Sequence, residues 1–152
     1  MELEATLQWT DIVTRMAAAY AIEPAIILAI IYVESRGDPT ALNQTSMATG
    51  LMQVMPQEAH AMFCLRPPSE VLLDPETNIA WGLKILSTYI EQEGTLWAAI
   101  YRYSGGKAWR SQAEFTHSFW LPFAEAWAEI EQQLRAQEQD GRLRIRHRNN
   151  SR

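Results

Sequence analysis

The stretch that decides the fold is Pro24–Arg36, with the sequence PAIILAIIYVESR. It is apolar nearly all round a helix, a pattern typical of a helix buried in the middle of a protein. Pro24 suits the first turn of a helix, where a backbone N–H is not needed. Gly37 follows in the position of a C-terminal cap, and Asp38-Pro39 begins a turn. We therefore predict a buried central helix over residues 24–36.

Helical periodicity continues on both sides of this segment. The apolar residues Trp9, Val13, Met16 and Tyr20 share one face and predict a helix over 8–21. Further helices are expected at 56–65, 75–93, 96–103 and from Pro122 onward, whereas 40–55 has no clean period and is expected to be irregular. Because no alternating strand pattern of useful length appears, the fold class is all-α. We expect a single helical domain packed around the central helix.

Composition sets the class of protein. The chain has 152 residues, 47% of them apolar and 20% charged, as expected for one globular domain. A lone Cys64 and the lack of zinc-ligand spacing argue against a disulfide scaffold and a structural zinc site. The longest apolar run is too short to cross a bilayer, and the acidic start Met-Glu-Leu-Glu lacks the basic residues of a signal peptide. We therefore expect a soluble product made in the cytoplasm.

Charge divides the chain into two parts. Residues 1–140 hold 8 Lys and Arg against 18 Asp and Glu, whereas residues 141–152 hold five Arg and no acid. We interpret these as a folded domain, 1–140, and a basic, disordered tail, 141–152. The acidic body argues against binding to nucleic acid. An alternative for the Arg-rich tail is an anchor on anionic envelope lipid or polymer.

Glu34 is the residue that does not fit the buried helix. It lies seven, four and three residues after Ile27, Ile30 and Ile31, and so shares their face. Burial and the negative end of the helix dipole both raise the pKa of a carboxyl group there. A raised pKa suits a general acid that must hold its proton near neutral pH. The alternative is that Glu34 is simply the first polar residue after the buried part and points to water.

Four sequence blocks accompany Glu34. They are ESRGDP at 34–39, ATGLMQVMP at 48–56, LDPETNI at 73–79 followed by Gly82, and AAIYRYSGG at 98–106. In order and spacing these blocks resemble the motifs of the soluble lytic transglycosylase catalytic domain, a relative of goose-type lysozyme. The resemblance runs from about residue 9 to 130, nearly the whole folded part.

The resemblance implies both an activity and a site. Members of this family cleave the β-1,4 bond between N-acetylmuramic acid and N-acetylglucosamine in peptidoglycan strands. A single glutamic acid, here Glu34, protonates the leaving oxygen and then acts as base on the C6 hydroxyl, which closes a 1,6-anhydro ring. No cofactor or metal is implied. The residues implied to contact substrate are Ser35, Asn43, Gln53, Met55 and Tyr103.

Three positions depart from the family pattern. Ser104 follows Tyr103 where the family usually has asparagine, and Asn43 stands about where a serine is common. Phe119 occupies a position where a tyrosine is common, so a hydroxyl near the acid is expected to be missing. These departures bear on the sugar subsites and the rate, and leave the acid itself unchanged.

A second catalytic carboxylate is not evident. Glycosidases that use water or a covalent intermediate place one across the scissile bond. Asp38 and Asp74 are explained as caps, Glu76 as a first-turn acid, and Glu58, in the first turn after Pro56, is expected to face solvent. Internal attack by a sugar hydroxyl needs no second carboxylate, so the sequence favours a transglycosylase. The alternatives are a hydrolytic muramidase and a non-catalytic wall-binding virion protein.

The route to the cell wall is a separate expectation. Without an export signal, the protein needs another way to reach peptidoglycan. A bacteriophage lysis enzyme or a virion-associated wall-degrading protein would meet that requirement, and we expect this chain to act on the wall by one of these routes.

Overall fold

The computed structural model describes residues 1–151, apart from the side chains of residues 143 and 145. The helices, in chain order, are α1 (Glu4–Leu7), α2 (Thr10–Ala18), α3 (Pro24–Ser35), α4 (Pro56–Phe63), α5 (Ser69–Leu72), α6 (Pro75–Glu93), α7 (Leu96–Tyr103), η1 (Gly106–Ala108), α8 (Gln112–Phe115), η2 (Thr116–Trp120) and α9 (Leu121–Asn150). Extended pairing within 1–151 is limited to isolated antiparallel bridges in the loop before α4. The all-α prediction is confirmed.

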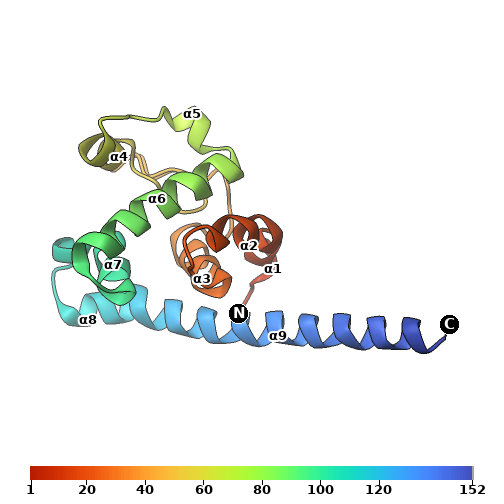
Figure 1. Cartoon of the computed structure of the whole chain (residues 1–152). Coiled ribbons are helices and arrows are strands. Elements are labelled where there is room, and N and C mark those ends of the chain that lie inside the picture. The colour runs from red at the N-terminus through yellow and green to blue at the C-terminus, as the bar shows by residue number, and fades with distance from the viewer. Residues whose placement is uncertain (152) are drawn as a thin grey trace.

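The central helix is α3. Its residues from Ala25 to Ile31 are buried, and it packs against α1 and α2 on one side and against α9 on another, as Figure 1 shows. The helix ends at Ser35, and its C-terminal cap is Arg36, not Gly37 as expected; the Arg36 backbone is left-handed, with a φ of 56°. Gly37 is also left-handed, and a Cβ atom there would collide with the backbone of Ala5. This tight end fixes where the chain leaves α3, directly after Glu34.

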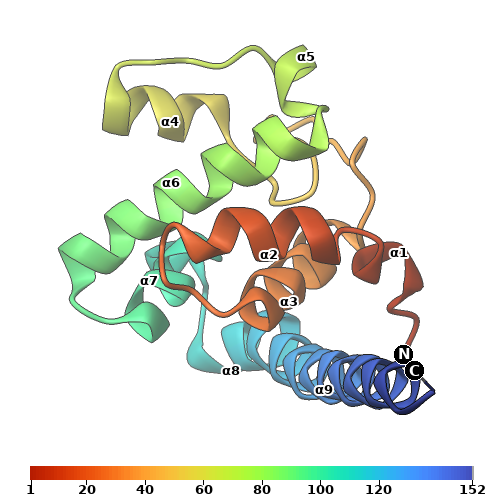
Figure 2. The same cartoon turned by 45° about the vertical axis from the view of Figure 1, so that its right-hand side comes forward.

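A second group of helices holds the other elements near the end of α3. Helix α6 packs against α2, α4, α5 and α7. Figure 2 shows that α4 and α5 lie on one side of α6 and α9 on the other. Helix α6 starts as predicted, because the Asp74 carboxylate accepts a 2.8 Å hydrogen bond from the Thr77 N–H. Gly94 ends it in a left-handed conformation, and Thr95 caps α7.

The predicted boundaries differ most at the two ends of the chain. The helix expected over 8–21 is shorter, with α2 at Thr10–Ala18, and the unpredicted α1 precedes it. Trp9 lies between the two helices, and its indole N–H donates to the Gly37 carbonyl at 2.9 Å. Helices α8 and η2, which we did not predict, precede α9 without a break. Their rings continue the stripe of α9, since Phe119 stacks between Phe115 and Phe123 with centroids 5.9 and 5.8 Å apart.

The prediction of a disordered tail from residue 141 is wrong for the residues described. Helix α9 continues through Asn150 and projects beyond the other helices (Figure 1). Past Pro122 this segment contains no proline, its arginine, glutamine and glutamate residues favour helix, and Asp140 pairs with Arg144 at 2.9 Å. Arg152, the last residue of the tail, lies outside the described residues. Among residues 1–151 no helix is long and apolar enough to span a bilayer.

Candidate active site

Glu34 occupies the last turn of α3, where the buried face of the helix meets the surface. Its side chain is half-buried, and burial raises the pKa of the carboxyl group to about 8, with the charge of Glu58 acting in the same direction. The prediction of a raised pKa is confirmed, and the alternative of a water-facing residue is contradicted. At neutral pH this group holds its proton.

The loop between α3 and α4 is held against Glu34 by hydrogen bonds to its backbone. The Ser35 hydroxyl lies 2.8 Å from the Leu51 carbonyl and 3.1 Å from the Ile31 carbonyl. The Tyr103 hydroxyl donates to the Met52 carbonyl at 2.7 Å. These bonds join the end of α3, the loop and the end of α7 into one unit around Glu34.

Asn78 makes more hydrogen bonds to the backbone around this loop than Ser35 or Tyr103 does. It is fully buried in α6, its amide nitrogen donates to the carbonyls of Thr49 and Leu72 at 2.7 and 2.8 Å, and its amide oxygen accepts the Met52 N–H at 2.8 Å. Sequence reasoning placed Asn78 inside a motif without giving it a role. The available signal was an amide four residues before Gly82 and seven before Ile85, on the same face of the helix.

The structure corrects the interpretation of Glu58. We expected this first-turn acid to face solvent, but its side chain is half-buried and burial raises the pKa of the carboxyl group, an effect that Arg102 partly offsets. It lies close enough to Glu34 and Tyr103 for its charge to act on both. The expectation failed because a helix start that is docked on other elements buries its first turn.

Tyr103 is brought to Glu34, as the sequence blocks implied. Burial, and then the charges of Glu34 and Glu58, raise the pKa of its phenol well above the ordinary value. The phenol therefore stays protonated and serves as a hydrogen-bond donor, which the loop carbonyl at Met52 accepts. Tyr103, Glu34 and Glu58 form one cluster of titratable groups contributed by α7, α3 and α4.

The other predicted site residues lie along the same loop but differ in what they can offer. The Gln53 amide nitrogen is engaged by the carbonyls of Ala41 and Gly50, both at 3.1 Å, so its amide oxygen is the group it can present to a sugar. Met55 is half-buried immediately before α4. Asn43 is exposed, and its amide oxygen accepts the N–H groups of Thr45 and Ser46.

Ser35, Asp38 and Glu76 are each engaged by other groups of the protein. Ser35 is buried and its hydroxyl is committed to backbone groups, so we leave it out of the substrate contacts proposed below. Asp38 accepts from both the N–H and the hydroxyl of Thr40, which agrees with its expected role in a turn. Glu76 pairs with Arg15 on the surface at 3.1 Å. Of the acids considered as a second carboxylate, Glu58 is the one that the structure brings to Glu34.

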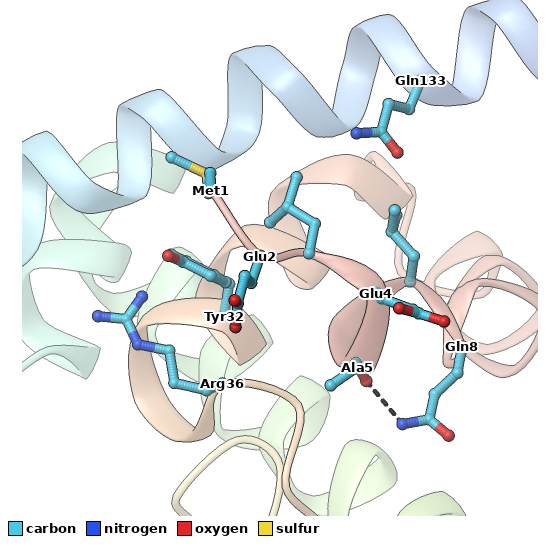
Figure 3. A pocket seen from close by; sticks show the side chains of 10 residues that line it. Met1, Glu2, Glu4, Ala5, Gln8, Tyr32, Arg36 and Gln133 are labelled. Carbon is cyan, nitrogen blue, oxygen red and sulfur yellow. Dashed lines mark hydrogen bonds between the residues drawn. The ribbon is translucent and has the colours of Figure 1, made fainter.

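A pocket of about 1380 Å³ lies on a neighbouring face of α3, between the N-terminal segment and α9 (Figure 3). Tyr32 and Arg36 line it, with the guanidinium 4.1 Å from the centre of the Tyr32 ring. Glu34 and Glu58 are not among its lining residues, so it is separate from the titratable cluster. In the described part of the chain, no group of three His, Cys, Asp or Glu side chains is arranged to hold a metal ion.

Comparison with a solved structure supports the fold. The chain aligns with the X-ray structure of an inactive glutamate-to-glutamine mutant of the lytic transglycosylase Slt from Pseudomonas aeruginosa. The TM-score is 0.56 at 23% identity, over 82% of this chain and 22% of the other. The fold class is therefore the all-helical, lysozyme-like class to which that enzyme belongs.

Sequence comparisons define the family. Residues 11–117 match the family described as the transglycosylase SLT domain, and this chain belongs to that family. A membrane-bound lytic murein transglycosylase E from Buchnera aphidicola is 40% identical over 85 residues, covering 52% of this chain and 38% of that protein. A transglycosylase of Enterobacteria phage PRD1 is 28% identical over 104 residues, covering 68% and 37%. The chain thus spans less than half the length of these relatives.

Proposed function

We propose that this protein is a lytic transglycosylase that cleaves the MurNAc-β-1,4-GlcNAc bond of peptidoglycan, with Glu34 as the catalytic residue. The observation that carries the proposal is a half-buried carboxyl group with a pKa of about 8 beside a loop tied to α3 and α7. Family membership and relatives named as lytic transglycosylases support the same activity. The solved relative described as inactive carries a glutamate-to-glutamine change, which agrees with an essential glutamic acid.

The chemistry follows from the state of Glu34. Its proton passes to the glycosidic oxygen as the bond from that oxygen to C1 of the muramic acid breaks, which releases the GlcNAc hydroxyl. The resulting carboxylate then takes the proton of the C6 hydroxyl as the C6 oxygen bonds to C1. The products are a free GlcNAc end and a 1,6-anhydro ring, Glu34 is protonated again, and no water is consumed. Gln53, Met55, Asn43 and Tyr103 are proposed to contact or support the bound glycan.

The test is mass spectrometry of muropeptides released from purified cell wall. We expect anhydro products, which are one water lighter than reducing-end products. Glu34→Gln should reduce their release by about 100- to 10,000-fold, as for loss of a general acid. Glu23→Gln is a matched control, because Glu23 is exposed at the opposite end of α3. Binding to the wall without any product from the wild type would favour a non-catalytic wall-binding protein instead.

Hydrolysis is a second candidate, favoured by one observation. Glu58 supplies a carboxylate close to Glu34, and hydrolytic glycosidases use such a pair. Reducing-end products in the same mass spectra would identify a muramidase and would contradict the transglycosylase proposal.

The exposed arginines of α9 are proposed to contact anionic envelope components. Arg142, Arg146 and Arg148 are exposed on the projecting part of the helix, where lipid or polymer phosphates can reach them. Deleting residues 141–152 should weaken killing of intact cells while sparing activity on purified wall. The triple replacement of these arginines by glutamine is the matched variant, because it keeps the helix and removes the charge. An equal fall in both assays would contradict the proposal.

We propose that the place of action is the cell wall, reached during phage infection. The similarity to a phage PRD1 transglycosylase supports this route. An antibody should detect the protein either in purified virions, which indicates a virion-associated enzyme, or only in infected-cell lysates, which indicates a lysis enzyme. Its absence from both would contradict the proposal.

A further inference from the structure

Glu58 is a carboxylate of the site that the proposed chemistry does not use. It is contributed by α4, whereas Glu34 comes from α3 and Tyr103 from α7. Within residues 1–151, no hydrogen bond or ion pair engages either glutamate side chain. The carboxylate oxygens of Glu34 and Glu58 are also not among the fully buried side-chain atoms that lack a hydrogen-bond partner. In the described part of the chain, both carboxyl groups are thus half-buried and committed to no hydrogen bond or ion pair of the fold.

The position of Glu58 is fixed by the loop that precedes α4. The Leu51 and Met52 carbonyls are bound by the Ser35 and Tyr103 hydroxyls, a few residues before Pro56 begins the helix. Proline in this first turn restricts the backbone further. The backbone leading into α4 is thus tied to both α3 and α7, and from the first turn of α4 the charge of Glu58 acts on Glu34 and Tyr103.

The charges around the pair decide the order in which the two groups ionise. Glu58 has a nearby cation in Arg102, whose charge lowers the pKa of Glu58 and so partly offsets the effect of burial. For Glu34, both burial and the neighbouring Glu58 act to retain the proton. Tyr103 is the other titratable group of the cluster and stays neutral. Arg36, two residues after Glu34, stacks over Tyr32 and does not pair with Glu34 in the described part of the chain.

We propose that Glu58 is a positioning residue for the reaction: as the fixed negative neighbour of Glu34, it keeps the proton on Glu34 before bond cleavage and strengthens Glu34 as a base afterwards. The inference rests on the proposed function, because it assigns Glu58 a role in that reaction. An ionised neighbour favours the protonated form of Glu34 in the first step. In the second step the same repulsion makes the Glu34 carboxylate a stronger base toward the C6 hydroxyl.

The test is the pH profile of anhydro-product release by Glu58→Gln, which removes the charge and keeps the shape. Because Glu34 then loses its proton at lower pH, the upper limb of the profile should move to lower pH. The ratio of activity at about pH 8 to that at about pH 6 should fall about twofold or more. An unchanged profile would overturn the proposal, whereas a purely structural role would lower activity equally at every pH.

Two matched variants sharpen this test. Glu58→Asp keeps the charge and should restore the wild-type profile. Glu70→Gln removes an exposed acid from the first turn of another short helix, α5, and should leave the profile unchanged. If Glu58→Gln fails to fold, Glu58→Ala serves as the uncharged variant, since alanine is the residue that favours a helix most.

A second measurement does not depend on catalysis. A ¹³C NMR titration of the Glu34 carboxyl should show a midpoint near 8 in the wild type. The midpoint should be lower in the uncharged Glu58 variants. An unchanged midpoint overturns the inference even where the wild type releases anhydro products, whereas failure of the wild type to release them overturns the proposed function. Selective loss of reducing-end products in Glu58→Gln would show that Glu58 activates water and would also overturn the positioning role.

Discussion

The region around Glu34 and the projecting part of α9 are both rich in polar side chains but use them in opposite ways. Around Glu34, buried groups such as Asn78 and the Ser35 hydroxyl bind backbone atoms of a loop. Along α9, exposed side chains pair one turn apart, as Arg144 does with Asp140 at 2.9 Å. Buried hydrogen bonds contribute more to stability than exposed ion pairs. Substitutions should therefore have effects that decrease from the first region to the second.

The largest effect is expected for Asn78→Ala. This change removes three hydrogen bonds and leaves the backbone groups of Thr49, Leu72 and Met52 buried without these partners. With about 1–3 kcal/mol for each unsatisfied group, the free energy of unfolding should fall by about 4 kcal/mol or more. Urea unfolding followed by circular dichroism measures it.

Asn43→Ala is the matched control in the same loop. Asn43 is exposed and its amide oxygen accepts only local N–H groups, from Thr45 and Ser46. Its loss should cost about 1 kcal/mol or less. Equal losses for the two asparagines would show that burial does not separate their contributions.

The next effect is a gain in stability from Glu34→Gln that grows with pH. The pKa of Glu34 is raised from 4.5 to about 8 on folding, so the folded state binds more protons between these values. Stability is then lost as the pH rises through this window, and below about pH 4.5 the carboxyl group makes no such contribution. Glutamine cannot ionise. Glu34→Gln should therefore stabilise the fold by about 4 kcal/mol at pH 8 and by about 1 kcal/mol or less at pH 5.

Thermal unfolding at several pH values checks this prediction. The difference in melting temperature between Glu34→Gln and the wild type should increase steadily from about pH 5 to about pH 8. Glu23→Gln, on the exposed end of the same helix, should show no such trend. A constant difference would mean that the carboxyl of Glu34 is not held protonated by the fold.

The same contrast explains what could be predicted from the sequence. The central helix was predictable because an apolar run beginning at Pro24 has one stable solution, burial among other helices. The caps at Asp74, Gly94 and Thr95 were predictable because they depend on neighbours in sequence. The continuation of α9 past residue 140 was not, because a charged segment without proline is compatible with either helix or disorder.

The site was predictable only in part, for the same reason. Glu34 stands out because its burial follows from the spacing of Ile27, Ile30 and Ile31 along one helix. The roles of Glu58 and Asn78 depend on contacts between α4, α6 and a loop far away in sequence, which no local pattern encodes. Glu58, an acid in the first turn of α4, becomes a neighbour of Glu34 only through contacts between segments that are distant in sequence.

A smaller effect is expected for Tyr103→Phe. The change deletes the hydroxyl that donates to the Met52 carbonyl at 2.7 Å and keeps the packing of the ring. One lost hydrogen bond at a half-buried site should lower the free energy of unfolding by about 1–2 kcal/mol. Activity should fall more than stability alone explains, because the loop beside Glu34 is less firmly held. Unchanged stability would show that the loop is held without this bond.

The smallest effect is expected for removal of residues 141–152. Residues 142, 144 and 146–150 are exposed, and the ion pair between Arg144 and Asp140 joins two surface residues of α9 itself. Exposed pairs of this kind contribute about 0.3–0.5 kcal/mol, so unfolding of the 1–140 chain should differ from that of the full chain by less than about 0.5 kcal/mol. A larger loss would mean that the projecting part of α9 supports the body, and that a folded domain ending at residue 140 is wrong. A loss within this limit makes the deletion a clean probe of envelope contact, because activity on purified wall then reports on an intact site.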